Sequence, residues 1–118
     1  MINPRHGRIS LPRAITFLFS KVGEGIKAHC LDFDIVAVSP TESAALAKLR
    51  EAVMLYVDHG LKNRWEEDIL CYAPDKYWAQ LTVDTPISLM DPITVEDQTM
   101  RVYSVEGVHG ARETVGAA

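Results

Sequence analysis

The stretch AITFLFSKVGEGIKAHCL, residues 14–31, decides the fold of this chain. Its first part places Ile15, Phe17 and Phe19 on alternate positions, which is the period of a strand with one well-buried side. Two glycines within residues 21–25 then supply a turn, and residues 26–31 alternate again. The stretch therefore predicts an antiparallel β-hairpin.

A corner, a third strand and a helix are predicted next. At the corner, Asp32 and Asp34 are expected to bond to nearby backbone amides, and the β-branched run at residues 35–38 predicts a short strand. Ser39 or Thr41 is expected to cap the helix, which Gly60 is expected to end. The helix prediction rests on apolar residues at three- and four-residue spacings: Ala45, Leu46, Leu49, Ala52, Val53, Tyr56 and Val57.

The C-terminal half gives weaker patterns. Residues 65–72 fit either a short helix or a strand, and residues 74–81 fit one or two helical turns. Residues 87–95 and 100–105 flank a polar stretch and fit a second hairpin. The predicted fold is α+β: an antiparallel three-stranded sheet with one main covering helix, in the order β-β-β-α, followed by a C-terminal extension with short helices and a possible hairpin.

Length and charge indicate how the chain is organised into domains and what kind of partner suits it. At 118 residues the chain suits one domain, so we expect a basic N-terminal arm at 1–13, a single α+β domain at 14–106 and a flexible tail at 107–118. The net charge of -4 argues against nucleic acid as the main partner and suits a basic protein. With no visible export signal and no apolar run near the ~20 residues of a membrane span, we expect a cytoplasmic protein without membrane contact.

Catalytic and metal sites have little support in the sequence. His29, Asp32 and Asp34 are suitable ligands for a divalent ion, but their spacing is unspecific. We favour the alternative that the two aspartates bond to the corner backbone and that His29 lies on the exposed face of its strand. Cys30 and Cys71 lack zinc or disulfide spacing and are expected to be reduced and semi-buried. No enzyme activity, metal or cofactor is expected.

The hairpin, the aspartate corner, the third strand and the helix entry together resemble the HicB-like antitoxin family. The resemblance covers residues 14–62, and it rests on residues at positions that match the family pattern: Gly25, Asp32, Thr41, Ala45 and the pair Glu51-Ala52. The chain departs from the pattern at Leu31, at Asp34-Ile35 and at Ala44, where the family usually has a proline, a Pro-Gly pair and a glutamate. The resemblance implies a partial ribonuclease H-like fold.

The same resemblance implies a function, which is to neutralise a small, basic ribonuclease toxin by masking it. The expected contact residues are Asp32, Phe33 and Asp34 at the corner. Direct DNA binding is doubtful, because residues after Lys62 show no basic recognition helix. Two alternatives stay open: a stand-alone homo-oligomer, and a metal-dependent nuclease on a ribonuclease H-like scaffold. Open sheet edges and the aromatic cluster Trp65, Tyr72, Tyr77 and Trp78 lead us to expect a homodimer.

Overall fold

Five strands and two helices follow one another in the computed structural model, which describes residues 11–63, 69–81 and 85–107. Their bounds are β1 (Ala14–Val22), β2 (Gly25–Cys30), β3 (Ile35–Ser39), α1 (Glu42–Lys62), α2 (Asp75–Trp78), β4 (Ile87–Val95) and β5 (Gln98–Glu106). Both expected hairpins are present, one formed by β1 and β2 and the other by β4 and β5. The short helix expected within residues 74–81 is α2.

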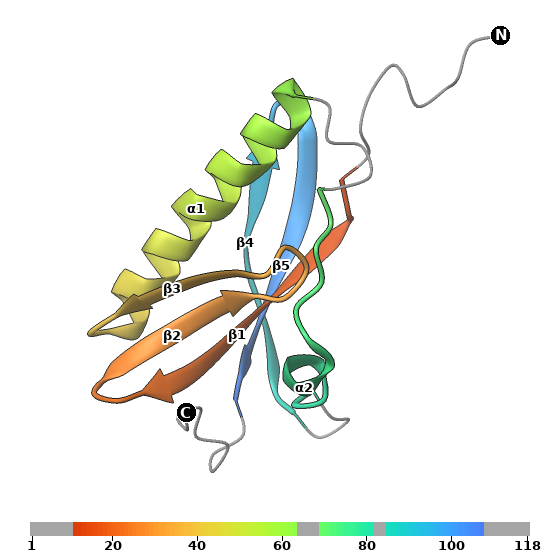
Figure 1. Ribbon diagram of the computed structural model, residues 1–118. Coiled ribbons are helices and arrows are strands. Elements are labelled where there is room, and N and C mark those ends of the chain that lie inside the picture. Colours follow the sequence, from red (N-terminus) through yellow and green to blue (C-terminus); the bar gives the residue numbers. More distant parts are fainter. Residues whose placement is uncertain (1–10, 64–68, 82–84, 108–118) are drawn as a thin grey trace, which may run out of the picture.

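The strands form one five-stranded mixed sheet in the order β3-β2-β1-β5-β4 (Figure 1). The neighbours β1 and β2, β2 and β3, and β4 and β5 are antiparallel, whereas β5 runs parallel to β1. The expected antiparallel three-stranded sheet was therefore wrong. The second hairpin is no separate extension, because β5 pairs with the free edge of β1.

The composition of β1 explains why the sheet continues past it. Phe17, Leu18 and Phe19 are consecutive, so they point to both faces of the sheet, and all three are fully buried. A strand that is buried on both faces needs a neighbour on each edge to satisfy its backbone groups. Pairing with β2 satisfies one edge, and pairing with β5 satisfies the other.

Helix α1 begins at its cap Thr41, whose side-chain oxygen accepts a hydrogen bond from the Ala44 amide at 3.2 Å. It continues through Gly60, so the helix stop expected there was wrong. Gly60 is buried within the helix, which ends instead at Asn63, whose backbone and side-chain amides both donate to the His59 carbonyl. The second of these bonds comes from the side chain, so glycine could not make it.

One face of the sheet packs against α1 and forms the main core (Figure 1). From the helix, Ala45, Leu49, Val53 and Val57 meet Ile15, Phe17 and Phe19 of β1, buried residues of β2, β4 and β5, and the partly buried Ile35 and Ala37 of β3. These strand residues include Ala28, Cys30, Ile93, Val95, Met100 and Val102.

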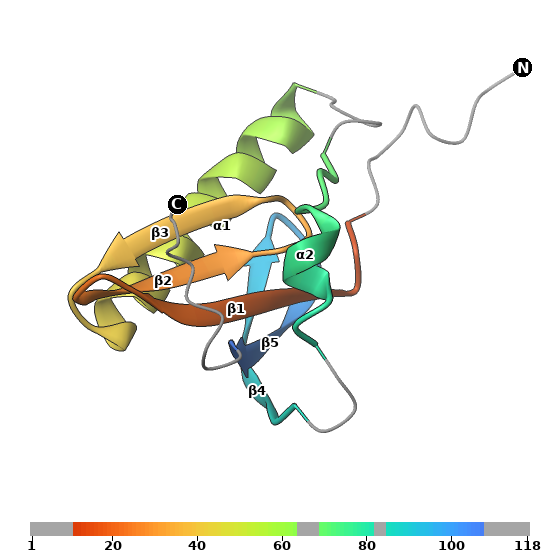
Figure 2. The same ribbon diagram turned by 60° about the horizontal axis from the view of Figure 1, so that its bottom comes forward.

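The opposite face is covered by the segment 69–81, which contains α2 (Figure 2), except that its first residue, Ile69, is buried in the main core. Leu18, Leu31, Ala73 and Val105 form a smaller buried cluster there. Partly buried residues of the same segment pack against it: Tyr77, Trp78 and Leu81. The molecule thus has α1 on one face of the sheet and a largely irregular segment on the other.

The predicted arm and tail fall mostly outside the described residues, as does much of the segment 65–72. The last part of the arm is described, and it lies beside β5: the Leu11 amide donates to the Gln98 side chain, and the Arg13 carbonyl accepts from the Arg101 amide. Within residues 11–63, 69–81 and 85–107, no helix has both the length and the apolar character that crossing a membrane requires.

Candidate protein-binding surface

The corner between β2 and β3 is held from two sides. The Leu31 amide donates to the Thr16 carbonyl, and the Asp32 carboxylate accepts from the Thr16 amide at 2.8 Å. On the other side, the carbonyls of Leu31 and Asp32 accept from the amides of Ala73 and Cys71. The corner therefore joins β1 to the segment 69–81.

Asp32 is a structural residue in this arrangement. Burial raises the pKa of its carboxyl group above the ordinary value, and the hydrogen bond from the Thr16 amide opposes that shift. The expected hydrogen bond to a backbone amide is present, although the amide belongs to β1. The carboxylate is thus directed into the fold.

Asp34 makes a different contact, with the side chain of His29. The Nε2 atom of His29 lies 2.7 Å from an oxygen of Asp34, and the Asp34 side chain is 40% exposed. His29 itself is 2% exposed, so its expected position on an open face was wrong. The segment 69–81 covers it, because the ring of Tyr77 packs edge-on against the imidazole at a centroid distance of 4.7 Å.

Two lysines flank the same tyrosine. The amino group of Lys27 lies 4.7 Å from the centre of the Tyr77 ring, and that of Lys76 lies 5.0 Å from it. Both distances allow a cation–π interaction. Lys27 belongs to β2, so its contact helps to hold α2 against that strand, whereas the Lys76 contact lies within α2.

The three residues considered for a metal site do not converge. His29 is bonded to Asp34, whereas the carboxylate of Asp32 accepts from Thr16. In the described part of the chain, no group of three or more His, Cys, Asp or Glu side chains is arranged to hold a metal ion. Of the cysteines, Cys30 is buried and Cys71 is exposed, and burial raises the pKa of the Cys30 thiol to about 12.

Exposed apolar side chains continue from the corner along β3. Ile35 and Ala37 pack against the main core, so Val36 and Val38 point to the opposite face of the sheet, where both are exposed. Tyr72 is also exposed, and it follows Cys71, which is bonded to the corner. We call Asp34, Val36, Val38 and Tyr72 the corner surface.

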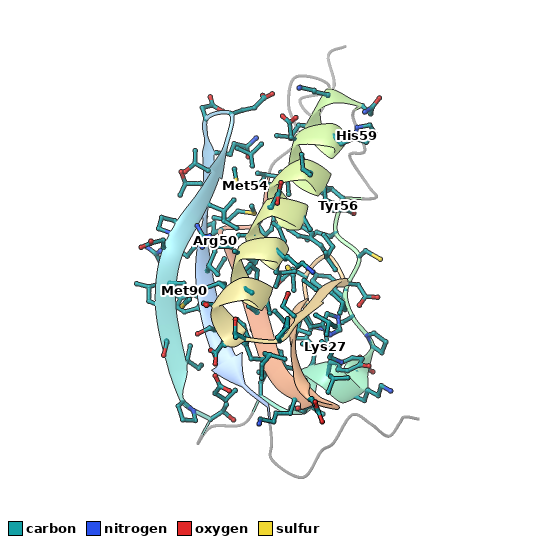
Figure 3. The ribbon with its side chains drawn as sticks, turned by 90° about the vertical axis from the view of Figure 1, so that its left-hand side faces the viewer. Lys27, Arg50, Met54, Tyr56, His59 and Met90 are labelled. Carbon is teal, nitrogen blue, oxygen red and sulfur yellow. The ribbon has the colours of Figure 1, made fainter. Side chains whose placement is uncertain are left out.

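The other edge of the sheet is β4, and its second half is closed by α1. A register shift between Met90 and Ile93 makes a bulge, and the guanidinium of Arg50 donates to the carbonyls of Asp91 and Pro92 at 2.7 and 3.0 Å. Figure 3 shows Arg50 and Met54 on the side of α1 that faces β4. The first half of β4 carries the exposed residues Ile87 and Leu89.

The expected contact residues have different positions in this structure. Asp34 is accessible at the corner surface, Asp32 is directed into the fold, and Phe33 is buried in the main core, where its ring packs against Tyr56. The valines of β3 were missed as contact residues. The sequence shows only that the run at residues 35–38 is apolar on both faces of its strand. Which face stays exposed depends on what covers the sheet there.

No protein-family model, curated protein or solved structure matches this chain. The likeness to HicB-like antitoxins thus rests on the residues quoted for it.

Proposed function

We propose that the chain is a non-catalytic binding module that masks a small, basic ribonuclease in the cytoplasm, in the manner of a HicB-like antitoxin. The observation that carries the proposal is the corner surface, in which the apolar side chains of Val36 and Val38 are exposed on one face of β3, Tyr72 is exposed and Asp34 is 40% exposed. Exposed apolar residues that lie together on a folded protein indicate a contact site for another molecule.

The composition of the corner surface suits a protein partner. Tyrosine is enriched at protein interfaces, where its ring contributes a large contact area at a small cost in conformational entropy. Val36 and Val38 are held by pairing with His29 and Lys27 of β2, so they need little ordering when a partner binds. The two valines of the corner surface thus present apolar side chains from a backbone that strand pairing already fixes.

Charge supports a basic partner. The chain has 16 acidic residues and 12 lysines and arginines, and an acidic protein attracts a basic one at long range. Lys27 and Lys76 are also near this face, but both lie over the Tyr77 ring. Asp34 is the exposed charge at the corner itself, and it would meet a lysine or arginine of the partner.

The first test is to tag the chain, express it in its native cell and identify by mass spectrometry what co-purifies in stoichiometric amount. We expect a small basic protein whose ribonuclease activity falls when the chain is added back. Recovery of the chain only with itself, at both low and high salt, contradicts the proposal and favours a stand-alone homo-oligomer.

A variant pair then locates the contact. Val38→Arg places a positive charge in the corner surface, and we expect at least a tenfold loss of affinity for the basic partner. Leu55→Arg is the matched control, because Leu55 is also an exposed apolar residue but lies on α1. Equal losses from both variants would place the contact elsewhere.

A further inference from the structure

We propose that the first half of β4 is a self-pairing edge through which two copies of the chain form a symmetric dimer. In the proposed dimer the two β4 strands are antiparallel, and Ser88 lies opposite the partner's Ser88. The two five-stranded sheets then form one continuous sheet. This inference is independent of the toxin-masking proposal, since it concerns the chain alone.

The available edge is short and well defined. In the part of the chain that the structure describes, β4 has β5 on one side and no strand on the other. Beyond Met90 the bulge, Pro92 and the Arg50 contacts interrupt the edge. Bulges and prolines are features that prevent edge pairing in natural sheets. The edge that can accept another strand is therefore residues 87–90.

This edge lacks the charge that normally protects such strands. Residues 87–90 are Ile, Ser, Leu and Met, and the side chains of Ile87 and Leu89 are 60% and 67% exposed. Edge strands are usually protected by a lysine or another charged side chain. Because residues 87–90 are uncharged, a second copy meets no like charge at this part of the edge despite the acidic balance of the whole chain.

The backbone groups that face outward follow from the hydrogen-bond pattern. The amide of Arg101 in β5 donates to Arg13, on the β1 side. Because successive strand residues direct their backbone groups to alternate sides, Val102 and Ser104 bond toward β4. Their partners in β4 are Met90 and Ser88. The backbone N–H and C=O groups of Ile87 and Leu89 are then directed to the open side.

These outward groups determine the register. If Ser88 lies on the two-fold axis, Ile87 is opposite the partner's Leu89, and Leu89 is opposite the partner's Ile87. Each of these two pairs can exchange both of its N–H···O hydrogen bonds. Ile87 and Leu89 also share one face of the sheet, so four apolar side chains meet across the axis. Residues 87–89 of one copy are thus complementary to the same residues of the other, as a two-fold symmetric contact requires.

The edge strand β3 does not offer the same contact. The amino group of Lys48 on α1 donates to the Val38 carbonyl at 3.3 Å, so part of that edge already has a hydrogen-bond partner. Between the two edges, β4 is therefore the better site for a second copy. The contact is small compared with the ~1,200–2,000 Å² of a standard interface, so we expect a dimer that forms with rising concentration.

Sedimentation equilibrium tests the contact. We expect Leu89→Lys to raise the dimer dissociation constant at least tenfold, and Val36→Lys, the matched change at an exposed valine of β3, to leave it within twofold. Both side chains are exposed, so neither variant removes core packing. A protein that is monomeric at every concentration, or equal shifts from both variants, would overturn the proposal.

Cross-linking tests the register. In the Cys71→Ser background, which removes the exposed thiol, Ser88→Cys places two thiols at directly opposed positions. Such a pair has its Cα atoms ~4.5 Å apart, within the range of a disulfide bond. Under mild oxidation we expect a disulfide-linked dimer from Ser88→Cys and none from Thr94→Cys, which lies beyond the bulge. The reverse result would overturn the proposed register.

Discussion

The two faces of the sheet are covered in very different ways. On one face, the 21 residues of α1 place an apolar side chain against the sheet at every turn. On the other face, the segment 69–81 contains a helix of only 4 residues, and few fully buried apolar side chains lie beneath it. Polar contacts take a larger share there, including the His29–Asp34 pair and the bonds of the Leu31–Asp32 corner.

This difference shows how a small chain can bury a sheet on both sides with a single long helix. The irregular segment needs hydrogen-bond partners for its own backbone, and the corner supplies carbonyl acceptors for Cys71 and Ala73. Packing thus dominates the α1 face, whereas hydrogen bonds position the covering segment on the other face. The following experiments test that division.

The largest effect on stability is expected from truncating one buried side chain on each face of the sheet in turn. Phe17→Ala removes a fully buried ring from the α1 face and should lower the free energy of unfolding by ~3–5 kcal/mol. Leu18→Ala, at the next residue on the other face, should cost less, about 2–3 kcal/mol, because the smaller cluster can close over the cavity. Urea unfolding of both variants measures the difference, and an equal or larger loss for Leu18→Ala would break the comparison.

A smaller effect is expected at the corner. Asp32→Ala leaves the Thr16 amide without its acceptor and should cost ~1–3 kcal/mol of unfolding free energy. Asp32→Asn is the matched control, because its side-chain carbonyl can still accept from Thr16 while the charge is removed. Urea unfolding at neutral pH should rank Asp32→Asn above Asp32→Ala. The opposite order would mean that the charge, rather than the hydrogen bond, holds the corner.

The pH dependence of stability, compared between the wild type and Asp32→Asn, tests the effect of burying the Asp32 carboxyl group. Burial raises the pKa of Asp32 above 3.8, so the folded protein keeps this proton at pH values where the unfolded chain has lost it. The stability from this group is fully present below the unfolded pKa and is lost as pH rises through the folded pKa. Relative to Asp32→Asn, the wild type should therefore be most stable at acidic pH. An advantage that grows toward neutral pH would contradict this sign.

Thiol labelling gives the mildest test, because it leaves the fold intact. Burial raises the pKa of Cys30 to about 12, whereas Cys71, in the covering segment, is exposed. At mildly alkaline pH we expect one thiol per folded chain to react promptly and the second only after unfolding. Cys71→Ser should abolish the prompt reaction. Rapid labelling of Cys30 in that variant would show that the main core opens more readily than its packing indicates.

Local patterns predicted most of the secondary structure. The alternation in residues 14–31 and the apolar spacing of residues 45–57 correctly indicated a hairpin and a helix, because each pattern depends on neighbours in the chain. The parallel pairing of β1 with β5 was missed because it joins distant segments. Three consecutive buried residues at Phe17–Phe19 were its signal, since a strand with only one buried face would not carry them.

The candidate site was only partly predictable for the same reason. Both aspartates were expected to bond to nearby backbone amides, and only Asp32 does, with the Thr16 amide. Asp34 bonds to the side chain of His29 instead, and both partners depend on how β1 and β2 are placed. His29 was assigned to an open face because the sequence does not show that Tyr77 covers it. Exposure of an edge strand likewise depends on strand order.

The parallel pair of β1 and β5 also affects how the chain is made. Ala14 pairs with Arg101, so the centre of the sheet joins segments from opposite ends of the described chain. On the ribosome, β1 emerges before β5 and keeps an open edge until β5 has been synthesised. Contacts between such distant segments slow folding, and an open strand edge can meanwhile pair with another chain. The time between the synthesis of β1 and that of β5 is thus the period of greatest risk for misassembly.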